Sequence, residues 1–395
     1  MSGVHAHHRG ARRESRRRRV RARRQAMAVV ASAVVVAGVA TGVMSALGGQ
    51  DKDTRAAPAV SASPTAAPLP AVPSATAAPR TPSAPASSAS RSPRPSKPAP
   101  SATGTTAPPA AGLYRHPGSQ VLDWVAAHRA DPRRPLIETR IAARPAAVWF
   151  ASYNPGEITG QVRAVTSAAT RTGRTPVLVP YAIPGRDCGG ASEGGAPDLV
   201  AYDAWIREFA AGLGGGPVIV ILEPDSVAQS DCLSAGDLAA RNASLARAGD
   251  ALHAANPKAK VYFDGGHSGW HPAAKQAAAL RAAGAASSGD GIFTNVSNFH
   301  RTADEAAYAR QVLAALGGPA RLGAVIDTSR NGNGAPRGDE WCDPAGRALG
   351  RAPTTRTGEA RIDAYLWVKL PGESDGCQGP AGSFSPDYAY ALATG

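Results

Sequence analysis

Residues 217–224 of the chain read PVIVILEP, and six other stretches between residues 146 and 370 have the same character. A short, nearly continuous apolar run is typical of a strand buried on both faces of a parallel sheet. The other six runs are AAVWFA (146–151), TPVLVPYAI (175–183), KVYFDG (260–265), GIFTNVS (291–297), LGAVIDTS (322–329) and IDAYLWVKL (362–370). Helical patterns lie between most of them, near 157–172, 199–213, 235–255, 272–283 and 302–316.

Repeated strand–helix units of this kind predict an α/β fold, and seven of them favour a parallel β/α barrel. An open, doubly wound sheet is the alternative, because periodicity does not show whether a sheet closes. No G-x-G-x-x-G follows the first strand and the chain has no P-loop, so nucleotide binding has no local support in the sequence.

The chain has 395 residues and a formal net charge of +13, which as a bulk value suggests a nucleic-acid-binding protein. The charge is unevenly placed: residues 1–25 carry a net +9, residues 26–112 carry +4, and the remaining 283 residues hold 27 basic and 27 acidic groups. A basic fold that clamps phosphates is therefore disfavoured. A neutral domain of this size suits one α/β fold with a substantial core.

The basic residues 1–25 precede 24 uncharged, mostly small apolar residues at 26–49. A helix of that length crosses a bilayer, and the arginines before it predict a cytoplasmic N-terminus and an exported remainder. The span is either a cleaved signal peptide or a signal anchor, because no clean A-x-A site follows it directly. A nucleic-acid-binding arginine tail is the alternative for residues 1–25, and the adjacent apolar span argues against it.

Residues 50–112 form a Pro/Ala/Ser-rich segment, in which positions 56–112 hold 14 of the 34 prolines. Almost nothing in it is able to build a core, so we expect a disordered, extended linker. The globular domain is expected at 113–395. The whole arrangement predicts a protein that is secreted, or anchored at the cell surface with its N-terminus in the cytoplasm.

All four cysteines lie in the predicted globular domain, at positions 188, 232, 342 and 377. An even number of cysteines in an exported chain predicts disulfides. Three pairings are available, and the simplest is local: Cys188 with Cys232 and Cys342 with Cys377. A metal site is disfavoured, because no pair has C-x-x-C spacing and no histidine lies near with ligand spacing.

Polar side chains follow six of the predicted strands at their C-terminal ends, where barrel enzymes have their active sites. They are Asp187, Asp225, Asp264, Asn298 with His300, Asp327, and Lys369 with Glu373 and Asp375. A single aspartate at such a position is a helix cap or a turn residue about as often as it is a functional residue. Several carboxylates around one mouth instead raise one another's pKa, which produces a general acid at neutral pH.

The residues around this mouth favour glycoside hydrolysis, which needs one acid and one base flanking the scissile bond. No G-x-S-x-G or H-E-x-x-H motif is present, and a metal set of Asp225, Asp264 and His267 is a less favoured alternative. Sugars stack on aromatic rings, and three tryptophans lie near. Trp367 is expected in the core, Trp341 is expected to be exposed and functional, and Trp270 follows the strand that ends in DGGH.

Seven segments closely resemble glycoside hydrolase family 6, the cellulases that cleave β-1,4-glucans with inversion. They are PYAIPGRDCGGASEGG (180–195), VILEPDSVAQ (220–229), VYFDGGHSGW (261–270), NVSNF (295–299), IDTSRNGNG (326–334), WCDP (341–344) and LWVKLPGESDG (366–376). The resemblance runs from about 113 to 395 in family order. It implies a distorted, seven-stranded, partly open β/α barrel (TIM-like), and it implies the local disulfide pairing.

The resemblance also implies catalytic roles. Asp225 in L-E-P-D matches the general acid, and Asp187 matches the aspartate that supports the raised pKa of the acid and helps to hold the catalytic water. Ser192 matches the loop serine that positions this water, and Tyr153 is the candidate for the tyrosine that distorts the sugar ring. Asp375 matches the proposed general base, to which the proton of the water passes directly or through a second water. Inversion places acid and base carboxyls roughly 6.5–9.5 Å apart.

The implied substrate-binding residues surround these groups. Trp270 resembles a sugar platform beyond the cleavage point, and Trp341, Lys369 and Glu373 resemble the groups that bind the glycone side. Asp264 opens a motif that reads D-G-G-H where the family has D-A-G-H. His267 and Asn298 complete the expected substrate-binding set.

The expected activity is endo-acting cleavage of β-1,4-glucan, because the loops after 183 and 370 are modest and predict an open cleft. No carbohydrate-binding module is visible, which favours soluble or amorphous glucan. A role on the cell-envelope glucan of the organism and a glycan-binding protein without catalysis are the alternatives. We expect a monomer that needs no metal or cofactor and binds no nucleic acid, with membrane anchoring through 26–49 as an option.

Overall fold

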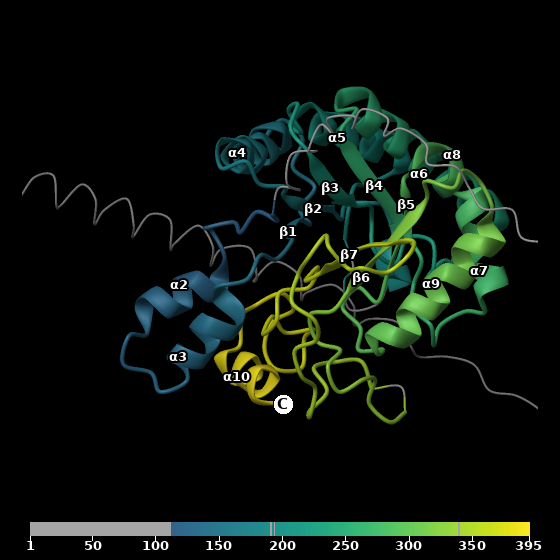
Figure 1. Cartoon of the computed structure of the whole chain (residues 1–395). Coiled ribbons are helices and arrows are strands. Elements are labelled where there is room, and N and C mark those ends of the chain that lie inside the picture. The colour runs from purple at the N-terminus through teal and green to yellow at the C-terminus, as the bar shows by residue number, and fades with distance from the viewer. Residues whose placement is uncertain (1–111, 190–191, 193, 339) are drawn as a thin grey trace, which may run out of the picture. The chain divides into compact units, whose positions relative to one another are not determined.

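The computed structural model describes residues 112–189, 192, 194–338 and 340–395 (Figure 1). The basic segment 1–25, the apolar span 26–49 and, apart from Gly112, the linker 50–112 lie outside the described residues. Among the residues that are described, no helix is both long enough and apolar enough to cross a membrane. All of them belong to the compact unit Ala99–Gly395.

The core of this unit is one parallel sheet of seven strands in the order β1-β2-β3-β4-β5-β6-β7. The strands are β1 (Val148–Phe150), β2 (Val177–Pro180), β3 (Val218–Ile221), β4 (Ala259–Asp264), β5 (Gly291–Thr294), β6 (Gly323–Asp327) and β7 (Ile362–Leu366). Every residue of β2, β3, β5 and β6 is buried, as expected for apolar strands with covered faces. All seven predicted strands are confirmed.

The sheet curls into a partly open barrel. Alternate side chains such as Ile219 and Ile221 join one inner cluster with residues of β2 and of β4 to β7, while Val218 and Val220 face the helices. The backbone N–H of Ala147 donates to the carbonyl of Trp367 at 2.9 Å, but β1 and β7 do not pair as strands among the described residues. The two edge strands, β1 and β7, are thus linked only through the segment after β7. This arrangement confirms the predicted partly open barrel.

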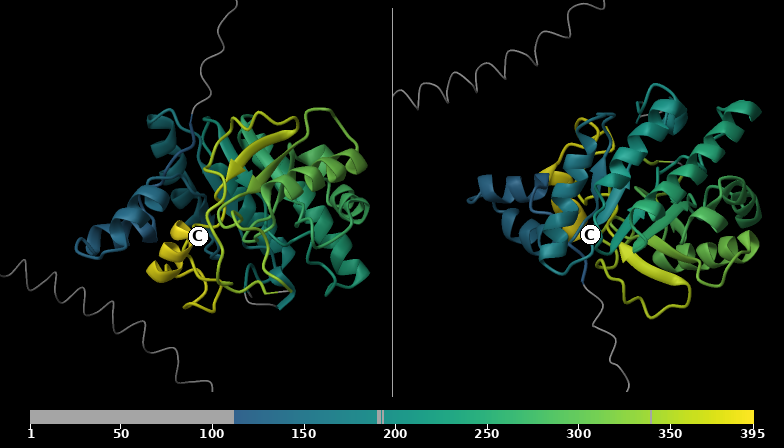
Figure 2. Two further views of the ribbon diagram at one scale, coloured as in Figure 1. Left: turned by 60° about the horizontal axis from the view of Figure 1, so that its bottom comes forward. Right: turned by 90° about the horizontal axis from the view of Figure 1, so that it is seen from above.

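Five long helices cover the outer face of the sheet (Figures 1 and 2). They are α4 (Ile158–Arg171), α5 (Leu199–Ala211), α6 (Ala235–Ala255), α7 (Ala273–Ala282) and α9 (Thr302–Leu316), and each confirms a predicted helix. Two of them begin at an ordinary N-cap: Asp198 accepts from the N–H of Ala201, and Ser234 from that of Asp237. The short α8 (Ala285–Ser288) precedes β5, and the 3₁₀ turn η2 (Arg186–Gly189) lies in the loop after β2.

A smaller group of helices packs beside the open edge of the barrel and was not predicted. It consists of α2 (Gln120–Ala127), α3 (Arg134–Ile137), the π-helical turn η1 (Glu138–Ala142) and α10 (Pro386–Thr394). Figure 1 shows α2 and α3, in blue, next to the yellow α10. Their apolar residues form a cluster with Trp367 and Leu370, so the predicted core position of Trp367 is confirmed.

Candidate active site

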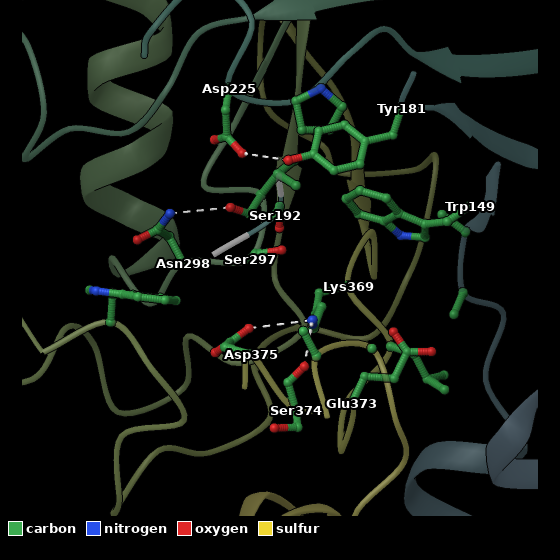
Figure 3. A pocket seen from close by; sticks show the side chains of 18 of the residues that line it. Trp149, Tyr181, Ser192, Asp225, Ser297, Asn298, Lys369, Glu373, Ser374 and Asp375 are labelled. Atoms are coloured by element: carbon green, nitrogen blue, oxygen red, sulfur yellow. Dashed lines mark hydrogen bonds and ion pairs between the residues drawn. The ribbon is translucent and has the colours of Figure 1, made fainter. Parts of the chain in front are cut away.

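A cavity of about 1160 Å³ opens at the C-terminal ends of the strands, where a barrel is expected to have its active site. Ten of the predicted catalytic and substrate-binding residues line it: Asp187, Ser192, Asp225, His267, Trp270, Asn298, Trp341, Lys369, Glu373 and Asp375. Figure 3 shows Asp225 and Asp375 on facing sides of this cavity, with Tyr181, Trp149 and Lys369 around it. The fold therefore gathers residues that are up to 188 positions apart in sequence, from 187 to 375.

Asp225 occupies the loop after β3 in a left-handed backbone conformation, with φ 69°. This conformation is uncommon for residues other than glycine, although aspartate adopts it more readily than most, and residues that adopt it cluster at active sites. Burial raises the pKa of the Asp225 carboxyl well above its usual range, and the charges of Asp264 and Asp187 raise it further. The carboxyl is thus kept protonated near neutral pH, which is the state that a general acid requires.

Tyr153 does not line the cavity, which corrects its predicted place in the catalytic set. Its side chain packs against the helix-covered core of the sheet. The tyrosine at the site is Tyr181, which lies just after β2 and whose hydroxyl donates to Oδ2 of Asp225 at 3.5 Å. Arg186 stacks its guanidinium over the Tyr181 ring at 4.3 Å, and the edge of Trp149 packs against it. Tyr181 stands in the quoted segment PYAIPGRDCG, so the sequence held a signal for it.

Asp264 also lies outside the cavity lining, and its predicted contact with substrate is corrected to a supporting role. Its side chain is 2% exposed. One carboxylate oxygen accepts from the N–H groups of Val227 and Ala228, at 3.0 and 2.8 Å, and the other accepts from that of Gly266. Asp264 therefore ties the loop that carries Asp225 to the end of β4, and its charge helps to raise the pKa of Asp225.

Two more buried carboxylates hold neighbouring loops in the same way. Glu223 accepts from the N–H groups of Ala182 and Ile183 at 2.9 to 3.1 Å, and burial raises its pKa to about 7. Asp327, at the end of β6, accepts from four N–H groups in the loops after β5, β6 and β7. The donors are those of Ser297, Ser329, Val368 and Lys369. Glu223 and Asp327 do not line the cavity, and they hold the loops around it by accepting hydrogen bonds from their backbone N–H groups.

Asp375 is held by two cations. Its Oδ2 accepts from Nη1 of Arg330 at 2.6 Å and from the N–H of Asp343 at 3.1 Å, and its Oδ1 lies 3.3 Å from Nζ of Lys369. Arg330 is fully buried, and its guanidinium also packs 4.4 Å from the ring of Phe299. Arg330 was missed as a site residue, because an arginine after a strand carries no signal that it will be buried.

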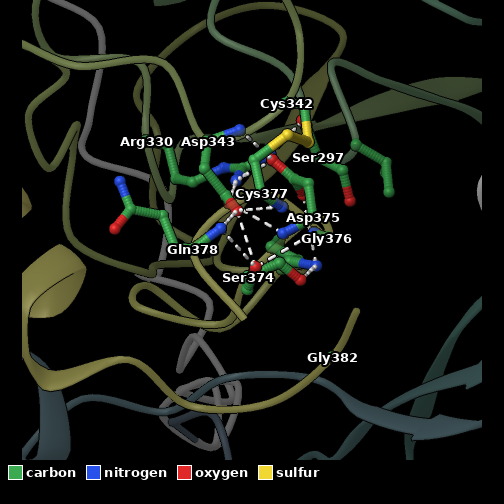
Figure 4. Close-up of polar contacts among 12 residues, drawn as sticks. Ser297, Arg330, Cys342, Asp343, Ser374, Asp375, Gly376, Cys377, Gln378 and Gly382 are labelled. Carbon is green, nitrogen blue, oxygen red and sulfur yellow. Dashed lines mark hydrogen bonds and ion pairs between the residues drawn. A yellow bond between two sulfur atoms is a disulfide. The ribbon is translucent and has the colours of Figure 1, made fainter. Parts of the chain in front are cut away.

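The loop that presents Asp375 is organised by Asp343 (Figure 4). The Asp343 carboxylate accepts from the N–H groups of Asp375, Cys377 and Gln378, and from the hydroxyl of Ser374 at 2.6 Å. These bonds hold the pKa of Asp343 below its usual range even though burial opposes them. Asp343, two positions after Trp341, therefore sets the position of the predicted base.

Both predicted local disulfides are confirmed. Cys188 pairs with Cys232 and Cys342 with Cys377, and the paired Cα atoms are 5.6 and 5.8 Å apart. Cys188 follows Asp187 directly, and the second pair joins the loops that carry Trp341 and Asp375. Each disulfide thus anchors a loop that contributes to the cavity.

One wall of the cavity is built from stacked rings. His267 lies 4.3 Å from His300 and 5.1 Å from Trp270, ring centre to ring centre. Burial, together with smaller effects of the neighbouring His300 and His271, lowers the pKa of His267 to about 3, so its ring is neutral at neutral pH. Trp341 is 54% exposed at the rim, which confirms that it is an exposed tryptophan. Neutral ring faces of this kind suit the apolar faces of sugars.

Glu373 and Lys369, from the segment after β7, also line the cavity. Burial raises the pKa of Glu373 to about 7, although Lys369 and Arg330 oppose the shift. No group of three or more His, Cys, Asp or Glu side chains that could hold a metal ion occurs in the described part of the chain. In the alternative metal set, the Asp264 carboxylate is already occupied by three backbone N–H groups.

Comparisons with known proteins agree with this geometry. Residues 113–393 match the family model described as Glycosyl hydrolases family 6. The chain is 56% identical over 293 residues to Endoglucanase 1 of Streptomyces sp. (strain KSM-9), covering 74% of this chain and 80% of that protein. It is 52% identical over 282 residues to Endoglucanase A of Thermobispora bispora, covering 71% of this chain and 61% of that protein.

A solved structure is also similar. It is the endoglucanase Cel6 from Mycobacterium tuberculosis in complex with methyl-cellobiosyl-4-deoxy-4-thio-β-D-cellobioside. That chain is 39% identical, with a TM-score of 0.67, and the match covers 72% of this chain and 97% of that one.

Proposed function

Because the chain belongs to the glycosyl hydrolases family 6, we propose that it is an inverting endo-β-1,4-glucanase that cleaves cellulose or related glucans. The observation that carries this proposal is the pair of carboxyls across the cavity. Asp225 is kept protonated by burial and neighbouring charge, and Asp375 is held in place by Arg330 and Lys369. One acid and one base on facing sides of a sugar-sized cavity suit single-displacement hydrolysis.

In the first step, Asp225 donates its proton to the glycosidic oxygen that leaves. The Tyr181 hydroxyl, 3.5 Å from Oδ2 of Asp225, and the Trp149 ring beside it restrict how the sugar at the cleavage point sits. Once the proton has left, the charge on Asp225 is stabilised by that hydroxyl. Loss of the leaving group generates positive charge at the anomeric carbon, which the neighbouring Asp187 carboxylate stabilises.

A water on the opposite face of the sugar attacks the anomeric carbon, and inversion follows from that geometry. We assign Asp375 as the group that takes the proton of the water, either directly or through a second water near Asp187 and Ser192. The Oδ2 atom of Asp375 is occupied by Arg330 and the Asp343 N–H, whereas Oδ1 has only Lys369 Nζ at 3.3 Å, so we assign Oδ1 as the oxygen that accepts this proton. Asp343 and the Cys342–Cys377 disulfide keep the loop in place.

The walls of the cavity bind the rest of the glucan. The ring stack of Trp270, His267 and His300 offers a platform on one side of the acid, and Trp341 offers a second ring at the rim. Lys369 and Glu373 hydrogen-bond sugar hydroxyls on the glycone side, where Glu373 is able to donate as well as accept because burial raises its pKa. The endo mode is supported by the relatives named endoglucanase, which are 56% and 52% identical.

We propose further that the protein acts outside the cytoplasm as a monomer, either secreted or anchored through residues 26–49. Two disulfides in the folded part support an oxidising compartment. Fractionation of the producing cells tests this: activity is expected in the medium if the span is cleaved and in the membrane fraction if it is an anchor. Activity confined to the cytosol would contradict the proposal.

The purified protein with carboxymethylcellulose and cello-oligosaccharides tests the activity. We expect a rapid fall in viscosity with few new reducing ends, and α-anomer products by NMR. Asp225→Asn should lower turnover by at least about 10²-fold, the usual range for a general acid. Asp250→Asn, an exposed change on α6, is the matched control. Binding without any new reducing ends would mean a glycan-binding protein, and β-anomer products would exclude inversion.

A further inference from the structure

The cavity extends past Glu373 to a basic end that no sugar-binding role assigned above uses. We call the basic end the part lined by Arg115, His116, Gly118–Val121, Ala142, Arg144 and Ala381–Gly382. Gln120, the first residue of α2, donates to the carbonyl of Gly382 at 2.7 Å and accepts from the N–H of Phe384 at 3.0 Å. Phe384 in turn forms a β-bridge with Glu373. The basic end therefore adjoins the Glu373 side, whereas Trp270 and His267 follow β4.

The charges at the basic end are all of one sign. Nη1 of Arg115 donates to the carbonyl of Ala142 at 3.2 Å, which brings its guanidinium to the segment that carries Arg144. No carboxylate of the described residues lies within the 4.0 Å ion-pair distance of either guanidinium. Of the acids on the packed elements, Glu138 pairs with Arg134, and Asp123 does not line the cavity.

The chemistry of the basic end also differs from the rest of the cavity. Elsewhere Trp149, Trp270 and Trp341 offer ring faces to an uncharged sugar, but no Trp, Tyr or Phe is among the described residues that line the basic end. Two guanidinium groups with unused N–H donors instead match a carboxylate, which Arg binds in a planar, two-bond geometry. The folded part of the chain is neutral as a whole, so this is a local concentration of charge.

We propose that the basic end binds a carboxylate carried by the glucan, and that the enzyme therefore favours β-1,4-glucans with acidic substituents, such as uronic acid units. The inference rests on the proposed function, because it places the carboxylate on the same chain that is cleaved beside Asp225. It adds a preference for substrate charge that cleavage of plain cellulose does not require.

The test compares kcat/KM on carboxymethylcellulose with kcat/KM on hydroxyethylcellulose of the same degree of substitution. The double variant Arg115→Gln/Arg144→Gln removes both charges from the basic end. Arg171→Gln/Arg207→Gln, on the exposed faces of α4 and α5, removes the same charge elsewhere. We expect the first variant to lose about 3- to 10-fold on the charged polymer, mainly through KM, and less than about 2-fold on the uncharged one.

Added salt should reduce the preference of the unmodified enzyme for the charged polymer, because exposed pairs are screened. Equal losses on both polymers, or a loss as large in the Arg171→Gln/Arg207→Gln control, would overturn the proposal. Failure of the unmodified enzyme to cleave either polymer would instead refute the proposed function itself.

Discussion

The charge of Asp187 acts on the general acid Asp225 and changes its protonation. Its charge is one of the causes that raise the pKa of Asp225, after burial and Asp264. Asp187→Asn removes that charge, so the pKa of Asp225 falls and the acid loses its proton at a lower pH. The basic limb of the kcat/KM profile should therefore move to lower pH by about 1 unit.

A pH series on a soluble cello-oligosaccharide measures this shift, and the same series on Asp250→Asn serves as a control far from the site. A basic limb that stays in place in Asp187→Asn would mean that some group other than Asp225 sets it.

Asp375 as the base gives a second expectation at the residue scale. Asp375→Asn should lower turnover by about 10²- to 10⁴-fold, and azide should restore part of the activity as an α-glycosyl azide, because an anion needs no base to attack. The azide product is identified by NMR. If azide does not rescue Asp375→Asn but does rescue Asp187→Asn, the proton leaves through the Asp187 side instead.

Single residues show where the sequence is informative and where it is not. Asp225, Asp187 and Asp375 stand in distinctive local motifs, so their place at the cavity could be predicted. Tyr153 and Tyr181 both follow strands, and only the packing of the strands decides which ring faces the cavity and which faces the helices. The burial of Arg330 is possible because its charge pairs with Asp343 and Asp375, which lie more than 10 positions away in sequence. Local sequence patterns do not reveal such partners.

At the scale of elements, the strand runs and helical stretches could be predicted because their buried faces are continuous and apolar. The helices α2, α3 and α10 could not, because they are short and their stability comes from a cluster with Trp367 and Leu370, after β7. The curl of the sheet likewise depends on the inner cluster, which joins side chains from six strands and from the segments beside them.

Two buried carboxylates, Asp327 and Asp290, join neighbouring elements at opposite ends of the barrel. Asp327 joins the loops after β5, β6 and β7, whereas Asp290, which precedes β5, holds His253, Lys260 and the N–H of Val261 at the other end of the barrel. Asn at either position replaces a strong acceptor with a group that donates as well. Each change should lower the free energy of unfolding by about 2–4 kcal/mol.

The two variants should differ in activity. Asp327→Asn should also lower kcat per folded molecule, because it loosens the loops that carry Asn298, Arg330 and Lys369, while Asp290→Asn should leave kcat close to normal. Denaturant unfolding and active-site-normalised kinetics measure the two effects. Equal kcat values in both variants would show that Asp327 only stabilises the fold.

For the whole molecule, the separation of charge has a physical consequence. The net charge of +13 lies entirely in residues 1–112, so the folded remainder has no net charge of its own. Its stability therefore depends on pH through particular buried groups. Asp290 has a pKa below the usual range, so its contribution is present above that range and is lost only in acid.

Glu373 acts in the opposite direction. Burial raises its pKa from 4.5 to about 7, so the folded protein holds a proton that the unfolded chain releases between those values. Stability should therefore fall as pH rises from about 4.5 to 7, and Glu223, whose pKa is also raised to about 7, adds to the fall. Glu373→Gln removes one ionising group, so its melting temperature should decline less over this range than that of the unmodified protein. Calorimetry at pH 5 and pH 7.5 measures the difference, and parallel curves for the two proteins would show that Glu373 ionises alike in the folded and unfolded states.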